Sequence, residues 1–153
     1  MKGAAAGKTV VIRSPHSVRP WQHVLEPLSG YLMLGARLLD GDVSCAGAYN
    51  FGPENSGVTT VLEAANILKE AWDDVKFEII PPENAPHEAK LLLLDASKAY
   101  RELGWKGVWN TEETLLRVAD WYRKFYCSGI ISTSDVLADY IECAKEKGLS
   151  WIK

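Results

Sequence analysis

Short β-branched segments alternate with amphipathic helical segments along the first part of the chain, and mostly helical patterns follow. Thr9–Ile12 has a strand pattern that Ser14 and Pro15 end, and a buried strand pattern runs over 47–53. Lys76–Ile80 alternates polar and apolar side chains like a half-buried strand. A lone first strand cannot bury both of its faces without neighbours. This order therefore predicts the second half of an α/β domain rather than a whole one.

Two helical segments lie between these strands. The first, over 24–39, predicts one buried face made of Val24, Leu25, Leu28, Leu32, Gly35, Leu38 and Leu39. In the second, Thr60 and Glu63 have the spacing of a capping box, in which the hydroxyl and the carboxylate satisfy free amides reciprocally. The residues that we expect this second helix to bury are Val61, Leu62, Ala65, Leu68 and Trp72.

The last sixty residues predict one short strand followed by three helices. The strand is 91–95, and a helix over 96–103 is closed by Gly104. Asn110 is predicted to cap the next helix, with Leu115, Val118, Ala119, Tyr122 and Phe125 on its inner face. The last helix spans 134–147, with Val136, Leu137, Tyr140, Ile141 and Ala144 inward.

Composition excludes several classes of protein. A chain of 153 residues with 47% apolar residues can build one domain, and a net charge of -3 does not favour nucleic-acid binding. Cys45, Cys127 and Cys143 are widely and irregularly spaced, which predicts no metal site and a reducing, cytoplasmic location. No apolar run predicts a membrane span, and Met1–Lys8 lacks the apolar core of a signal peptide.

Four sequence motifs, in order, resemble one enzyme family. They are RSPHSVRPWQHVLEPLSGYL at 13–32, YNFGP at 49–53, APHEA at 85–89 and DASKA at 95–99, the last continuing to LGW at 103–105. Together they are similar to CDP-glucose 4,6-dehydratases, members of the extended short-chain dehydrogenase/reductase superfamily. The resemblance covers nearly the whole chain, from about Gly7 onward, and Trp105, Trp109, Trp121 and Tyr122 resemble the packing cluster of the family.

The resemblance implies a fold, a reaction and a cofactor. The chain would be the carboxyl-terminal portion of an extended short-chain dehydrogenase/reductase, mostly helical with a few short strands, forming a single partial domain over 1–153. In the complete enzyme NAD takes hydride from C4 of CDP-glucose, water leaves across C5 and C6, and hydride returns at C6. The product is a CDP-4-keto-6-deoxy sugar, a precursor in surface polysaccharide biosynthesis, and the complete enzyme would be a homodimer.

The residues that would carry the redox step are missing from the sequence. The family needs a glycine-rich turn between a strand and a helix for NAD, together with a Tyr-x-x-x-Lys pair. No tyrosine here is followed four residues later by lysine, and the glycines are too widely spaced for such a turn. We therefore expect this chain by itself to have no catalytic residues, to bind no NAD and to be inactive.

The resemblance also assigns six substrate-binding residues. Arg19 would grip the nucleotide diphosphate, since a guanidinium forms paired charge-assisted hydrogen bonds. Ile12 and Arg13 would lie against the base, and Thr59 near the phosphates. His87 and Glu88 lie in the loop where related enzymes often carry an arginine, which is Ala85 here, and Glu88 would accept hydrogen bonds from the ribose.

Each of these residues also has a structural interpretation. Arg19 alone would be a solvated charge, Ile12 and Arg13 an ordinary strand end, Thr59 part of a helix start, and Glu88 part of an exposed loop. Trp21 and His23 we assign to packing. The rival functions are part of another nucleotide-sugar dehydratase or epimerase, or a non-catalytic binding module.

Overall fold

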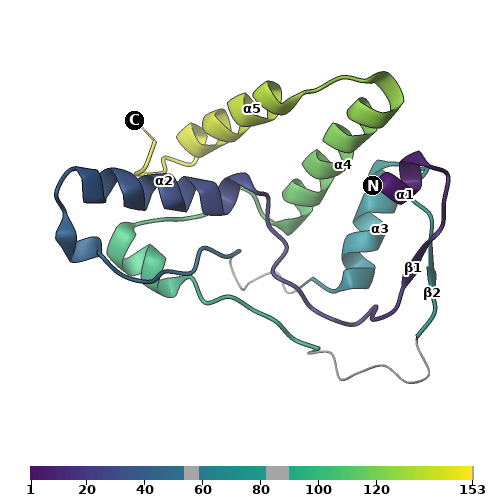
Figure 1. Cartoon of the computed structure of the whole chain (residues 1–153), viewed down its shortest axis with the longest axis horizontal. Helices are drawn as coiled ribbons and strands as arrows, with labels where there is room; N and C mark the ends of the chain where they lie inside the picture. The colour runs from purple at the N-terminus through teal and green to yellow at the C-terminus, as the bar shows by residue number, and fades with distance from the viewer. Residues whose placement is uncertain (54–58, 82–89, 153) are drawn as a thin grey trace.

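A computed structural model describes residues 1–53, 59–81 and 90–152. In these ranges the fold is mostly helical with two short parallel strands (Figure 1). The α-helices are α1 (Lys2–Ala5), α2 (Leu25–Leu39), α3 (Val61–Ala71), α4 (Thr111–Ser128) and α5 (Thr133–Glu146). The strands are β1 (Val10–Ile12) and β2 (Phe77–Ile79), and the short helical turns are η1 (Val43–Cys45) and η2 (Ala99–Leu103).

The two strands form a small parallel sheet that is open on both faces. Val10 pairs with Phe77, and Ile12 with Ile79. Val10 and Val11 are neighbours, so they point to opposite faces, and they are 45% and 47% exposed. Only Ile12 of β1 is buried. The expectation that the first strand lacks cover is confirmed for the described residues.

Two of the predicted strands do not form. The segment 47–53 is irregular, and Phe51 is buried against Trp105 instead of pairing in a sheet. The segment 91–95 makes only an isolated bridge, from Leu91 to Val18. A strand requires a neighbour for its backbone groups along its length. Val18 pairs with the start of segment 91–95 only, and among the described residues the pairing does not continue beyond Leu92.

The buried face of α2 is the opposite of the predicted one. Glu26, Ser29 and Gly30 are buried, whereas Leu32 and Leu39 are 75% and 90% exposed. Two contacts set this orientation: Glu26 binds loop 105–109, and a Cβ on Gly30 would lie 2.3 Å from the Phe51 ring. Of the predicted inward leucines, Leu25 is half-buried and packs against the core. The prediction was wrong for Val24, Leu28, Leu32, Leu38 and Leu39, which are exposed and leave an apolar stripe at the surface.

The helix boundaries set by local sequence are confirmed. Thr60 with Glu63, and Asn110 with Glu113, form capping boxes at the starts of α3 and α4. Gly104 ends η2 with φ +73°, in the left-handed region that glycine favours. In α4 and α5, Leu115, Ala119, Tyr140 and Ala144 are buried as expected, but Tyr122, Phe125 and Leu137 are exposed.

Two aromatic clusters hold the helices together. Phe51 and Trp105 form one with Cys45, Ala99 and Leu103. Trp109 and Tyr140 form the other cluster with Val108 and Ala144, where α5 packs against residues 108 and 109. Trp151 touches both clusters. The prediction that Trp105 and Trp109 are packing residues is confirmed.

Candidate functional site

The chain segment before α2 is fixed between two others at Val18. Val18 forms an antiparallel bridge to Thr60 and a parallel bridge to Leu91. Its amide donates to the carbonyl of Lys90 at 2.8 Å, and the amide of Val61 donates to the carbonyl of Ser17 at 2.9 Å. We call this place, over 17–21, 59–61 and 90–92, the Val18 crossing.

Arg19 and Thr59, two of the six predicted binding residues, meet at the Val18 crossing. The Arg19 guanidinium donates to the carbonyl of Val18 at 2.8 Å and is only partly exposed. The Trp21 indole donates to the carbonyl of Thr59 at 3.1 Å. Residues 40 positions apart in the sequence are thus held beside each other by backbone pairing.

The other predicted residues are placed differently. Ile12 is buried at the end of β1, where its carbonyl accepts from the Ile80 amide at 3.1 Å, and Arg13 is exposed just after it. Ile12 therefore has the contacts of an ordinary strand end. His87 and Glu88 lie outside the described residues, which resume at Lys90, at the Val18 crossing.

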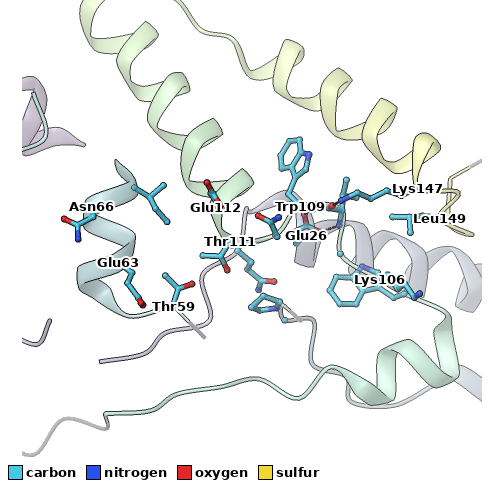
Figure 2. A pocket seen from close by; sticks show the side chains of 18 residues that line it. Glu26, Thr59, Glu63, Asn66, Lys106, Trp109, Thr111, Glu112, Lys147 and Leu149 are labelled. Atoms are coloured by element: carbon cyan, nitrogen blue, oxygen red, sulfur yellow. Dashed lines mark hydrogen bonds between the residues drawn. The ribbon is translucent and has the colours of Figure 1, made fainter. Parts of the chain in front are cut away.

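A cleft of about 830 Å³ begins at Thr59 and runs between α3, α4 and the carboxyl-terminal segment. Figure 2 shows Thr59 and Glu63 on its α3 side and Lys106, Lys147 and Leu149 on the opposite side. The walls mix carboxylates, lysines, amides and two indoles. The residues that line the cleft are Gln22, Glu26, Gly52, Pro53, Thr59, Glu63, Asn66, Ile67, Trp105–Thr111, Glu112, Lys147 and Leu149.

Glu26 is buried beside this cleft and holds the loop that forms one wall. Only 2% of it is exposed. Its carboxylate accepts from the amides of Val108 and Trp109, both at 2.8 Å, and from the Tyr140 hydroxyl at 2.9 Å. A Cβ on Gly107 would lie 3.1 Å from the same carboxylate, so a glycine allows the loop to come this close.

Burial disfavours the charged form of the Glu26 side chain. Desolvation raises the pKa of Glu26, and it outweighs the hydrogen bonds from Trp109, Val108 and Tyr140 and the charge of Lys147, which lower the pKa. Desolvation also raises the pKa of Tyr140. The carboxylate is therefore held in place by three donors in an environment that penalises its charge.

The carboxyl-terminal segment holds the same loop from its other side. The Lys147 ammonium donates to the carbonyl of Val108, the Trp151 indole to that of Lys106 at 3.4 Å, and the Ser150 hydroxyl to that of Gly104 at 3.5 Å. Glu26 accepts from the amides of loop 105–109 while this segment donates to its carbonyls. The loop is thus fixed between α2 and the segment after α5.

Sequence reasoning missed Glu26 and its hydrogen bond from Tyr140, although Tyr140 was predicted to face inward. The available signal was an acidic side chain inside an apolar helical run, between Leu25 and Leu28. A charge at such a position either faces solvent or is buried with partners. Its partners lie more than 80 residues further along the chain, so the sequence pattern did not identify them.

Trp21 and His23 have the structural roles that the sequence suggested. Trp21 bonds to the Thr59 carbonyl, and the His23 ring packs edge-on against Trp109 with centroids 5.0 Å apart. Burial, followed by the nearby Arg117 charge, lowers the pKa of His23. Both side chains fix the start of α2 against its neighbours.

The described residues include neither a glycine-rich dinucleotide turn nor a cluster of metal ligands. After β1 the chain continues through Arg13, Ser14 and Pro15, and after β2 through Ile80 and Pro81. Within these ranges neither strand leads through a glycine-rich turn into a helix, which the pyrophosphate of NAD requires. The same ranges contain no group of three or more His, Cys, Asp or Glu residues placed to hold a metal, and no helix long and apolar enough to cross a membrane.

Comparison with curated proteins finds two kinds of relative. The chain is 43% identical over 114 residues to CDP-glucose 4,6-dehydratase of Salmonella typhimurium. The aligned region covers 74% of this chain and 32% of that enzyme. It is 27% identical over 118 residues to UDP-glucose 4-epimerase 4 of Oryza sativa subsp. japonica, and this aligned region covers 77% of this chain and 31% of the epimerase. The chain thus spans about a third of the length of these relatives. No family model matches it.

Comparison with solved structures finds the same fold. A UDP-glucose-4-epimerase from Stenotrophomonas maltophila, with bound NAD and formylated UDP-arabinopyranose, matches with a TM-score of 0.66 and 23% identity, over 82% of this chain and 39% of that one. A second UDP-glucose 4-epimerase matches with a TM-score of 0.64 and 19% identity, over 80% and 39%. The fold described above is therefore part of the epimerase fold.

Proposed function

Because this chain is related to CDP-glucose 4,6-dehydratase and to the nucleotide-sugar epimerases of the extended short-chain dehydrogenase/reductase family, we propose that it is the nucleotide-sugar-binding part of a CDP-glucose 4,6-dehydratase. Its role is to bind CDP-glucose and to present the sugar to a dinucleotide-binding part that carries NAD. Binding energy from the nucleotide, remote from the reacting carbons, would position the sugar. A cytoplasmic location belongs to the same proposal.

The meeting of Arg19 with Thr59 carries the proposal. A diphosphate needs a cation and neutral donors within one short stretch of space, and the Val18 crossing supplies a guanidinium, a threonine and the first turn of α3. Arg13 and Ile12 would contact the base, and His87 and Glu88 the ribose. The 43% identity to the CDP-glucose enzyme, against 27% to the plant epimerase, favours cytidine over uridine.

The exposed apolar surface supports a role as one part of a larger catalytic unit. Both faces of the sheet are open, and α2 presents the stripe of Val24, Leu28, Leu32 and Leu39 to solvent. Parallel sheets in α/β proteins are covered on both faces. A dinucleotide-binding part would cover these surfaces and supply NAD and the catalytic Tyr-x-x-x-Lys.

Nucleotide binding tests the proposal directly. We expect CDP and CDP-glucose to raise the melting temperature of the chain more than UDP, GDP or dTDP at equal concentration, because a ligand stabilises the state that it binds. Arg19→Ala should reduce this shift, whereas Arg123→Ala, at an exposed arginine of α4, should retain it in full. Equal shifts with all four nucleotides would contradict the cytidine assignment, and a larger shift with UDP would favour an epimerase.

An activity assay tests the need for a second part. We expect the chain with NAD and CDP-glucose to produce no keto sugar, because the described residues supply no dinucleotide turn. The assay follows the ultraviolet absorbance of the 4-keto product in alkali. Turnover by the purified chain would contradict this expectation.

A further inference from the structure

The segment from Arg19 to Glu26 is anchored at successive residues to three other parts of the chain. The Trp21 indole donates to the Thr59 carbonyl, and the Thr111 hydroxyl donates to the Trp21 carbonyl at 3.4 Å. The Gln22 amide group donates to the Phe51 carbonyl at 3.0 Å. No freely rotating link separates the Val18 crossing from α2.

Glu26 is the last and most deeply buried of these anchors. His23 and Glu26 both hold Trp109, the former through its ring and the latter through the backbone amide at 2.8 Å. The amide of Glu26 donates to the His23 carbonyl at 3.0 Å, so the two residues form one turn. Loss of the carboxylate would release loop 105–109 from the start of α2.

We propose that Glu26 is a positioning residue for the nucleotide-sugar site: by fixing the start of α2 to loop 105–109 and to Tyr140, it sets the position of Arg19 at the Val18 crossing. This inference rests on the proposed function, because it assigns Glu26 a role in placing the phosphate-binding arginine. Glu26 does not touch the ligand. It acts through the segment 19–23, which it reaches from the start of α2 and also by way of loop 105–109 and the hydrogen bond from Thr111 to the Trp21 carbonyl.

A double-mutant cycle tests the coupling. Binding of CDP is measured by calorimetry for the unchanged chain, Glu26→Gln, Arg19→Ala and the double variant. The glutamine keeps the shape of the side chain but places an NH2 group against the Val108 or Trp109 amide. We therefore expect the affinity for CDP to fall about fivefold, and this loss to depend on the presence of the Arg19 side chain. In the Arg19→Ala background, Glu26→Gln should have no further effect. Independent, multiplying losses would overturn the proposal.

Two further variants separate positioning from general loss of stability. Glu142→Gln removes an exposed carboxylate of α5 that does not line the cleft, and it should leave CDP binding unchanged. Tyr140→Phe removes one donor to Glu26 while keeping the ring, and should weaken binding in the same pattern but less. If Glu26→Gln fails to fold, Tyr140→Phe takes its place in the cycle.

Amide hydrogen exchange distinguishes failure of this inference from failure of the proposed function. Amide exchange reports the free energy of local opening at each residue. In Glu26→Gln we expect about tenfold faster exchange at Val108 and Trp109, and also at Val18 and Trp21 if Glu26 fixes them through segment 19–23. Faster exchange at Val108 and Trp109 alone would overturn the positioning role. If the unchanged chain binds no CDP, the proposed function fails, and the exchange at Val18 and Trp21 still decides whether Glu26 fixes the crossing.

Discussion

Gly30 lies where α2 comes closest to the aromatic core. We predict that Gly30→Ala lowers the free energy of unfolding by about 1–3 kcal/mol, because the added methyl would overlap the Phe51 ring. Gly35 is also within α2, but a Cβ there meets nothing within 4 Å. Gly35→Ala should therefore raise the free energy by up to about 1 kcal/mol. Urea unfolding of both variants is the measurement, and equal effects would contradict the close packing at Gly30.

Glu26 gives the stability of the chain a specific pH dependence. Its pKa is raised above the ordinary value of 4.5, so the folded chain holds this proton more tightly than the unfolded chain. The resulting stabilisation is present below pH 4.5 and is lost as the pH rises through the folded pKa. Tyr140 and Lys147 face the carboxylate, and Glu26→Gln leaves both in place.

We therefore predict that the free energy of unfolding of the unchanged chain, relative to Glu26→Gln, falls as the pH rises from 4.5 toward neutrality. Urea unfolding at a series of pH values measures the difference between the two proteins, in which other titrating groups cancel. A difference that rises with pH would show that the hydrogen bonds outweigh desolvation.

Two helix starts offer a matched comparison at the level of elements. Asn110 caps α4 through its side chain, which accepts from the Glu113 amide at 2.8 Å. Ser132 precedes α5 without such a bond, and its buried hydroxyl has no partner among the described residues. We predict that Asn110→Ala costs about 1 kcal/mol of stability, whereas Ser132→Ala is neutral or stabilising. Thermal unfolding measures both, and a larger loss at Ser132 would contradict the assignment of the caps.

The same elements show which features the sequence can predict. Capping at Thr60 and Asn110 depends on residues three positions apart, and the sequence predicted the helix starts at both sites. The buried face of α2 depends on Trp105, Val108 and Trp109, which lie 76 to 83 residues away from their partners. The periodicity selected the most apolar face, whereas the structure buries the face with the polar partners.

The candidate site was predictable only in part for the same reason. The resemblance selected Arg19 and Thr59, and backbone pairing at Val18 brings them together. It also selected Arg13, which is exposed after β1, and Glu88, which lies outside the described residues. The cleft with Glu26 was not predicted, because no single stretch of sequence encodes it.

At the scale of the whole molecule, the apolar stripe on α2 should make the isolated chain associate. Monomeric proteins rarely expose a continuous apolar patch of this kind. We predict that the chain forms concentration-dependent oligomers and that the double change Leu32→Gln with Leu39→Gln makes it monomeric without loss of stability. Sedimentation velocity over a concentration series measures this. As a control, Leu116→Gln, at an exposed position of α4, should leave association unchanged.

The hydrogen bond between Glu26 and Tyr140 joins residues 114 positions apart, so it has consequences for synthesis. A ribosome adds about 5–20 residues per second, so α2 waits several seconds for this partner. Until Val108 and Trp109 are made the carboxylate stays hydrated, and until Tyr140 follows it lacks its third donor. Nascent chains released before residue 140 would therefore lack the contact that fixes the start of α2, and would be the species most exposed to proteases and chaperones.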